Sequence, residues 1–297
     1  MALQSSGAIS LANIQTEFGG SNPIGMSEYY RGGANVTSNN TSVPASGAID
    51  MADFYGTSNL QSWETTDVFG DGSGKFLYRL NNTLNESTGA FNAMVKFAGS
   101  GNPAYTTNTP NTNKISHAFN HTTSGAKIQV SGLNFSNDNS HSLSFWIRHQ
   151  DTNSDAFFMQ YWNGSTSNAG RNNITVSNHG NNFGSWPYNT SGGANFIQIS
   201  SGTTNSLFNN TWKHVVWTWN DNGWQSNCYI NKSSTSISQL NGNNRSMRTN
   251  TYFRIGQRGD NQTNNNKNFE ICQIRAFNKR LSQSEVNTLY HEIADNP

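Results

Sequence analysis

Residues 211–220 read TWKHVVWTWN, and residues 141–150 read HSLSFWIRHQ. In both stretches apolar and polar residues alternate, so that Val215 and Trp217 fall on one face and His214 falls on the other. An alternation of period two is typical of a β-strand that is buried on one side. Each stretch lies next to Asn, Ser or Asp, which favour turns. The two stretches therefore predict two strands of a half-buried sheet.

The same alternation continues on either side of these stretches, from about Asn59 onward, and gives about ten short strands with no helix between them. They are FLYRL (76–80), AKIQV (126–130), SLSFWIRH (142–149), AFFMQYW (156–162), NITVS (173–177), NFIQIS (195–200), KHVVWTW (213–219), NCYI (227–230), YFRIG (252–256) and FEICQIRAF (269–277). This pattern predicts an all-β, antiparallel sandwich. The chain then ends in a short helix, EVNTLYHE, which Ser282 and Glu285 open as a capping box.

The composition supports a folded β protein with long polar loops. Hydrophobic residues make up 33% of the 297 residues and charged residues 12%, both below the usual fractions for globular domains. Disordered chains are typically rich in charge and poor in aromatic residues. This chain instead contains 17 Phe, 10 Tyr and 8 Trp, which is ample for a core.

The charge and the hydropathy pattern exclude several classes of function. The formal net charge is +1 and the pI is about 7.8, so no basic footprint for nucleic acid exists. No apolar stretch approaches the ~20 residues needed to span a bilayer, and MALQSSGAIS lacks the features of a secretory signal. We expect no membrane insertion and synthesis in a cytoplasm. We predict that Cys228 and Cys272 are buried free thiols, with a disulfide as the alternative.

The first 57 residues carry an internal repeat. Residues 6–12 read SGAISLA and residues 46–52 read SGAIDMA, and each copy leads through an aromatic residue to a glycine. Ser10 and Asp50 are helix-capping residues, so each copy predicts a helix of one or two turns. Residues 27–33 predict a third turn that a double glycine ends. We therefore divide the chain into a module of residues 1–57 and a domain of residues 58–297.

Helices this short do not stand alone in water, so their apolar residues must pack on one another or on a neighbour. A module of this size has little core of its own, and we expect it to be unordered in the free protein and to dock onto other subunits. The candidate docking residues are Ile9, Leu11, Ile14, Phe18, Tyr29, Tyr30, Ile49, Met51 and Phe54.

Several motifs of the larger domain resemble those of laminin-G-like, concanavalin A-like jelly rolls. They are DVFGDGSGKFLYRLNNTLNESTGAFNAMVKF (67–97), HSLSFWIRHQ (141–150), TWKHVVWTWN (211–220), CYINK (228–232) and FEICQIRAFNKRLSQSEVNTLYHE (269–292). They occur in the family's order and cover about residues 59–293. The resemblance implies a jelly-roll sandwich. One position departs from the family, because Lys232 stands where a glycine usually follows the asparagine, and we expect this hairpin turn to differ.

The N-terminal module is similar to a segment that heads structural proteins of tailed bacteriophages, marine ones in particular. The similarity rests on SSGAISLANIQTEFGG, NPIGMSEYYRGG and PASGAIDMADFYG. It implies a virion protein of the tail, fibre, baseplate or capsid surface, assembled in the bacterial cytoplasm among other virion proteins. Virions are symmetric, so we expect a homo-oligomer such as a trimer. The alternative is a free lectin or adhesin that is no part of a virion.

Catalysis is not predicted. A glycosidase needs two carboxyl groups that flank the scissile bond, and no predicted strand carries two acids at alternate positions. Glu270 is the acid within a predicted core strand, and it has no acidic partner on its face. The histidines are scattered, and no nucleophile motif accompanies them.

Sugar binding is the sharper prediction for the sandwich. An aromatic ring stacks on the C–H face of a pyranose, and neighbouring Asn, Asp or Gln side chains bind its hydroxyl groups. Aromatic residues in Asn-rich surroundings provide this combination. The alternative is that such rings cap the sandwich or lie in a subunit interface. The candidate residues are Trp162, Trp186, Tyr188 and Trp224.

Calcium is the one cofactor that the resemblance raises. Laminin-G-like domains sometimes hold an ion near the sandwich edge, and calcium requires six to eight oxygen ligands. Asp67, Asp71 and Asp260 could contribute carboxylates. Turns stabilised by aspartate side chains explain the same residues without metal.

Overall fold

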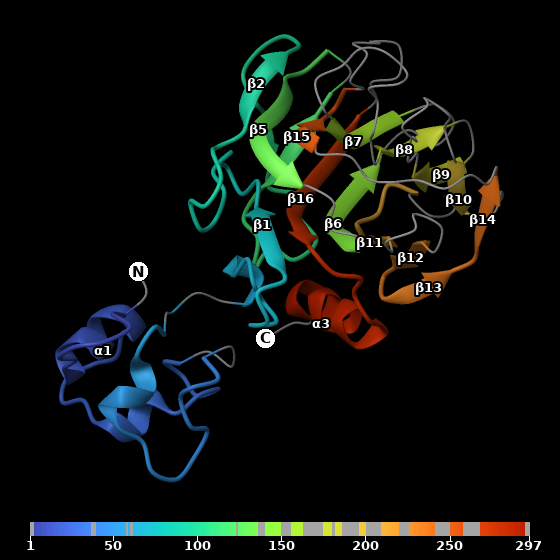
Figure 1. The fold of residues 1–297 in the computed structure, drawn as a ribbon. Helices are drawn as coiled ribbons and strands as arrows, with labels where there is room; N and C mark the ends of the chain where they lie inside the picture. The colour runs from blue at the N-terminus through green and yellow to red at the C-terminus, as the bar shows by residue number, and fades with distance from the viewer. Residues whose placement is uncertain are drawn as a thin grey trace. The chain divides into compact units, whose positions relative to one another are not determined.

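A computed structural model describes residues 3–36, 40–57, 59, 62–122, 124–135, 140–149, 156–162, 175–179, 182–185, 196–199, 209–219, 226–240, 250–257 and 268–294. The chain separates into two compact units, Met1–Val68 and Phe69–Pro297. Figure 1 shows short helices in the first unit and strands throughout the second. The sequence placed the boundary at residues 57/58. None of the described helices combines the length and the hydropathy that a membrane-spanning helix requires.

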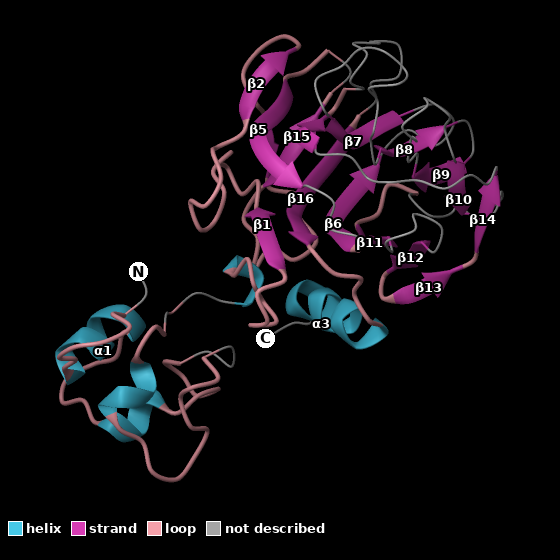
Figure 2. Ribbon diagram, in the orientation of Figure 1, coloured by secondary structure: helices cyan, strands magenta, loops and turns pink. Residues whose placement is uncertain are grey.

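The second unit contains two antiparallel sheets, drawn in magenta in Figure 2. The described strands of the first sheet lie in the order β13-β12-β11-β6-β16-β4-β3, and β1 also pairs with β16. Their bounds are β1 Gly74–Tyr78, β3 Tyr105–Thr106, β4 Ala118–His121, β6 His141–His149, β11 Lys213–Trp219, β12 Ser226–Ile230, β13 Ser233–Thr235 and β16 Phe269–Phe277.

The second sheet has the order β14-β10-β9-β8-β7-β15-β5-β2 over the described strands. The bounds are β2 Val95–Ala98, β5 Lys127–Phe135, β7 Ala156–Trp162, β8 Thr175–His179, β9 Asn182–Ser185, β10 Phe196–Ile199, β14 Ile237–Leu240 and β15 Asn250–Ile255. Each of the ten runs predicted from alternation overlaps one of these strands, so the predicted all-β fold is confirmed. The remaining described strands are short, and several lie at the sheet edges, where selection for apolar residues is weak.

The core lies between the two sheets. Aromatic rings from opposite sheets meet there: Phe76 and Phe253 are 5.5 Å apart between centroids, and Phe158 and Phe269 are 5.2 Å apart. These four side chains are fully buried. Such ring pairs add to the free energy gained by burial. They explain how a chain with few aliphatic residues fills a sandwich.

The described part of the larger unit also contains a C-terminal helix, α3 (Gln283–Ala294), which covers part of the first sheet. Its capping box forms as predicted, since the amide of Ser282 donates to Glu285 Oε2 at 2.7 Å and the amide of Glu285 donates to Ser282 Oγ at 3.3 Å. Cys228 and Cys272 are buried free thiols, as predicted. Burial raises the pKa of both thiols.

The β12–β13 hairpin keeps a tight turn despite Lys232. Asn231 and Lys232 both adopt positive φ, 46° and 65°, as a two-residue turn of this kind requires. A lysine in this conformation is less favourable than a glycine. Its side chain reaches α3, where Nζ lies 3.0 Å from His291 Nε2 and 5.3 Å from the Tyr290 ring centroid. The contacts with α3 offset the backbone cost, so the expected difference in this turn lies in the side chain.

The first unit contains the three predicted turns as α1 (Leu11–Phe18), η1 (Met26–Tyr29) and η2 (Met51–Phe54), followed by η3 (Ser62–Glu64). Their apolar residues pack on one another and form a core separate from that of the sandwich. The fully or nearly buried members of this core are Ile14, Phe18, Tyr29, Val36, Val43 and Phe54.

This core corrects part of the predicted docking set. Ile14, Phe18, Tyr29 and Phe54 are at most 4% exposed, so they hold the module together rather than face a partner. The other candidates lie nearer the surface and are half-buried or exposed. They are Ile9, Leu11, Tyr30, Ile49 and Met51.

Candidate carbohydrate-binding surface

The outer face of the first sheet carries a row of polar side chains next to an aromatic ring. Glu270 of β16 lies beside Arg148 of β6 and beside Asn120 of β4 in the sheet register. On the side of β6 away from β16, Lys213 at the start of β11 pairs with Ile147. Trp212, one residue earlier, therefore lies next to Arg148. Because successive residues of a strand point to opposite faces and Ile147 is in the core, Arg148 and its neighbours in this row point outward.

Hydrogen bonds join this row into one cluster. Arg148 Nη1 lies 2.5 Å from Glu270 Oε2, and the two side chains are 16% and 5% exposed. Asn108, from the loop after β3, donates to the same carboxylate oxygen at 3.5 Å. Its Oδ1 accepts from the indole N–H of Trp212 at 3.2 Å. Arg148 Nε in turn donates to the carbonyl of Asn210 at 3.1 Å.

The cluster combines the chemical groups that recognise sugars. Asn108 is exposed, and the indole of Trp212 is half-buried with its N–H already bonded. Its ring therefore offers an apolar body, and the amide of Asn108 offers both a donor and an acceptor. Arg148 and Glu270 neutralise each other, so the cluster has no net charge. We call these four residues, Asn108, Arg148, Trp212 and Glu270, the Trp212 cluster.

Helix α3 covers the next part of the same face. Trp146 of β6 stacks on Tyr290 of α3 with centroids 5.7 Å apart and an interplanar angle of 24°. Arg275 of β16 forms an ion pair with Glu292 of α3 at 2.5 Å, and both side chains are 4% exposed. The loop that carries Asn108 is tied to the end of the same helix by hydrogen bonds from Asn111 to the carbonyl of Ile293 and from Lys114 to that of Glu292.

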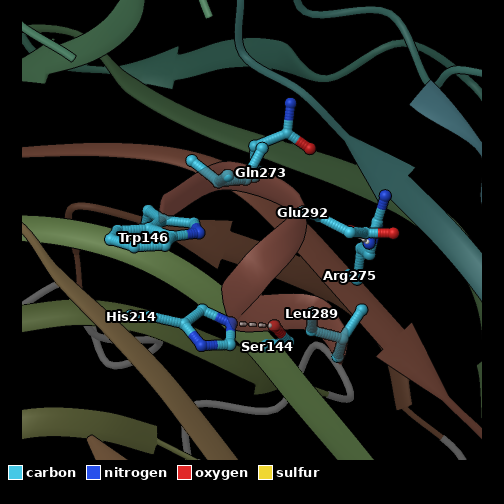
Figure 3. Close-up of a pocket in the computed structure, with 8 residues that line it drawn as sticks. Ser144, Trp146, His214, Gln273, Arg275, Leu289 and Glu292 are labelled. Carbon is cyan, nitrogen blue, oxygen red and sulfur yellow. Dashed lines mark hydrogen bonds and ion pairs between the residues drawn. The ribbon is translucent and has the colours of Figure 1, made fainter. Parts of the chain in front are cut away.

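A small polar cavity lies between α3 and the sheet, and Figure 3 shows the side chains around it. Ser144 Oγ and His214 Nε2 are 2.9 Å apart at one side of this space. Burial, with a smaller contribution from Arg275, lowers the pKa of His214 to about 3, so this histidine is neutral at pH 7. Gln273 adopts φ 53° at a bulge in β16, and both polar atoms of its buried amide lack a hydrogen-bond partner among the described residues.

The size of this cavity decides its role. Its volume is about 10 Å³, roughly the room that a single water molecule needs. A sugar ring does not fit. The open Trp212 cluster is therefore the better candidate for a ligand, and the cavity belongs to the packing of α3.

Three of the four aromatic residues predicted to bind sugar lie outside the described residues. They are Trp186, Tyr188 and Trp224. Trp162 lies at the end of β7, where its backbone pairs with Tyr252 of β15. Sequence reasoning missed the Trp212 cluster, although TWKHVVWTWN was the most prominent motif. Neither the register that aligns residues 148, 212 and 270 nor the position of the loop that carries residue 108 is visible in one sequence.

Of the three candidate calcium ligands, Asp71 takes part in a turn and in an ion pair. Asp71 Oδ1 accepts from the amide of Ser73 at 3.0 Å, and Oδ2 pairs with Lys279. The hydrogen bond from Lys279 is the main reason that the pKa of Asp71 falls to about 2. The bond to Ser73 is the aspartate turn offered as the alternative to calcium. Asp67 belongs to the first unit, and Asp260 lies outside the described residues. Within the described part of the chain no three His, Cys, Asp or Glu residues are grouped as metal ligands.

The environment of Glu270 also bears on catalysis. Its carboxylate is held by Arg148 and Asn108, and its neighbours in the sheet register are Arg148 and Asn120. A glycosidase needs a second carboxyl group across the substrate, and neither of these register neighbours is an acid.

Comparison with known proteins identifies the family. The sequence pattern of the concanavalin A-like lectin/glucanases superfamily matches residues 121–287. The chain belongs to this superfamily. The match covers most of the sandwich, including Arg148, Trp212 and Glu270. A comparison with curated protein sequences finds no match.

Several solved structures share the fold of this superfamily member. The binding domain of Paraclostridial Mosquitocidal Protein 1 is 18% identical, with a TM-score of 0.53 over 73% of this chain and 51% of that chain. The binding domain of Botulinum Neurotoxin DC in complex with SialylT is 19% identical, with a TM-score of 0.55 over 75% and 52%. The chain spans about half the length of these structures. At this level of identity they show a shared lectin-like fold.

Proposed function

We propose that the protein is a non-enzymatic carbohydrate-binding protein whose sandwich binds a glycan at the Trp212 cluster. The observation that carries the proposal is the juxtaposition of the half-buried ring of Trp212 with the amide of Asn108, above the Arg148–Glu270 ion pair. Because the two charges neutralise each other, we expect a neutral pyranose to bind more strongly than an acidic one.

The experiment is a glycan array probed with the full-length protein. Because one structural neighbour is in complex with SialylT, the array includes sialylated as well as neutral glycans. We expect Trp212→Ala to weaken binding to the best neutral glycan at least about tenfold, which corresponds to about 1.4 kcal/mol. The matched control is Trp63→Ala, which removes a half-buried tryptophan from the other unit.

Two other results of the array would contradict this assignment. If Trp212→Ala binds like the unchanged protein while Trp186→Ala or Trp224→Ala does not, the site includes Trp186 or Trp224 instead. If no glycan binds, the sandwich serves as a structural surface without this activity.

We propose in addition that the module of residues 1–57 attaches the sandwich to a larger particle, a bacteriophage virion, with the sandwich on the outside. Two observations support attachment: the module resembles the segment that heads phage structural proteins, and it forms a compact unit separate from the sandwich. The partners are then other virion proteins and the site of action is the virion, where several copies of this chain are expected on each particle because virions are symmetric.

Cryo-electron microscopy of intact particles tests the attachment. We expect density for the module among other virion proteins and density for the sandwich at the surface. Absence of the chain from particles would favour the free lectin.

A further inference from the structure

The module of residues 1–57 consists of one ten-residue unit that occurs three times. The units are SGAISLANIQ (6–15), SNPIGMSEYY (21–30) and SGAIDMADFY (46–55). Each has serine at its first position, isoleucine at its fourth and leucine or methionine at its sixth. The second unit keeps little more than these positions, so the sequence alone shows two copies clearly and the structure identifies the third.

The three units start their helices in the same way, although the first helix is an α-helix that continues to Phe18 and the other two are 3-10 helices of four residues. In each unit a short helix begins at the sixth residue, namely Leu11, Met26 or Met51. The side chain at the eighth position accepts a hydrogen bond from the backbone amide at the fifth. The three bonds are Ser10 to Asn13 at 3.0 Å, Gly25 to Glu28 at 2.9 Å and Asp50 to Asp53 at 2.9 Å. The ninth position is completely buried in all three, as Ile14, Tyr29 and Phe54.

The contacts between units close a ring. The tenth residue of each unit donates a hydrogen bond to the second residue of the next. Gln15 Nε2 donates to Asn22 Oδ1 at 3.1 Å, and the hydroxyl of Tyr30 donates to the carbonyl of Gly47. The hydroxyl of Tyr55 then donates to the carbonyl of Gly7 and returns to the first unit. Three equivalent units joined in a closed cycle form an arrangement with approximate threefold symmetry.

The first three residues of every unit lie on the surface. Residues 6–8, 21–23 and 46–48 are all exposed, and none of them is charged. Approximate threefold symmetry places them as three equivalent loops around one axis. A patch built this way is complementary to a surface that presents one site three times, because interfaces follow the symmetry of the partners. Three weak contacts made together then give a tight attachment.

We propose that the module binds on a threefold axis of a trimeric partner, one chain to three partner subunits, with each exposed loop at the same site of a different subunit. The partner surface is uncharged and fits small side chains. The inference rests on the proposed attachment to a particle and adds the symmetry, the stoichiometry and the contacting loops.

Photo-crosslinking on assembled particles tests the proposal. A photoreactive amino acid replaces Ala8, Pro23 or Ala48, one at a time, in the full-length chain. We expect all three positions to crosslink to the same peptide of the same partner protein. The control position is Val95, 55% exposed on the sandwich, which we expect not to capture that peptide. Quantitative mass spectrometry of the particles should give one copy of this chain for three copies of the partner.

A second set of variants checks the equivalence of the loops without crosslinks. Ala8→Glu, Pro23→Glu and Ala48→Glu should each lower the number of copies per particle by a similar factor, and the triple variant should abolish attachment. Circular dichroism shows whether each variant still folds. Crosslinks to three different peptides, or loss confined to one loop, would overturn threefold binding and leave attachment intact. Absence of the unchanged chain from particles would overturn both proposals.

Discussion

At the scale of single residues, the first sheet buries four described histidines, and burial lowers the pKa of two of them, His141 and His214. His141 stacks on Trp219 with centroids 4.6 Å apart and neither ring nitrogen has a hydrogen-bond partner among the described residues. His214 lies beside Arg275 at the α3 cavity. The pKa of both His141 and His214 falls to about 3. Both are therefore neutral in the folded protein over the range in which an ordinary histidine titrates.

Because these two histidines stay neutral when folded, we expect the free energy of unfolding to fall in mild acid. The unfolded chain binds their protons as the pH falls below about 6.5 and the folded chain does not, so stability is complete above pH 6.5 and is lost toward pH 3. The free energy of unfolding should fall by about 1.4 kcal/mol per pH unit for each histidine. His141→Phe keeps a ring on Trp219 and should flatten this dependence. Urea unfolding at pH 7 and pH 5 measures how the free energy of unfolding changes with pH. An equal change for the unchanged protein and for His141→Phe would contradict the prediction.

At the scale of elements, helix α3 is held to the first sheet by a buried ion pair. Arg275 and Glu292 are each 4% exposed in their side chains. A buried pair adds little net stability compared with apolar residues of the same volume, but the loss of one partner leaves an unpaired charge in a dry environment. The last turn of α3 also anchors the loop of Asn108 through Asn111 and Lys114. The helix therefore positions one side of the Trp212 cluster.

Glu292→Ala should lower the free energy of unfolding by about 3–5 kcal/mol because it leaves Arg275 buried without this carboxylate. The double variant Arg275→Met/Glu292→Leu should recover most of the loss. Hydrogen exchange should show faster exchange of the α3 amides in the single variant. An unchanged exchange rate in α3, together with reduced stability, would place the role of the pair elsewhere.

The sequence predicts those strands in which core-facing apolar residues alternate with residues on the other face. Alternation locates β7, β11 and β16 at their exact bounds because each has one face in the core. It misses β13, whose residues Ser233–Thr235 are polar and lie at a sheet edge. Alternation does not predict the Trp212 cluster, for a different reason. Its members are brought together by the register of β6 and β16 and by a loop, and register depends on the whole sheet.

At the scale of the whole molecule, the two units have cores of very different size. Among the described residues, the core of the module contains six buried hydrophobic residues and that of the sandwich many more. Stability rises with the surface that folding buries. The units should therefore unfold separately in denaturant, with the module first.

Phe54→Ala tests this independence. Phe54 contacts Phe18 and Tyr29 edge-on, with centroids 6.0 and 6.1 Å apart. Removal of a buried phenylalanine costs about 3–5 kcal/mol, which is enough to unfold so small a core. Hydrogen exchange followed by mass spectrometry should show loss of protection across residues 3–57 and none in β6 or β16. A parallel loss in both units would show that they fold as one.

The position of β16 has a consequence for synthesis. This strand lies between β6 on one side and β4 and β1 on the other, and its partner β1 comes from the opposite end of the domain. The first sheet therefore cannot close until residue 277 has left the ribosome, whereas the contacts of the module are complete once residue 57 has emerged. At ordinary elongation rates the interval is on the order of tens of seconds. During that time the nascent chain has a folded module, while its first sheet lacks β16 and leaves strand edges unpaired. Premature termination before residue 269 would therefore release an aggregation-prone product that still carries an intact attachment module.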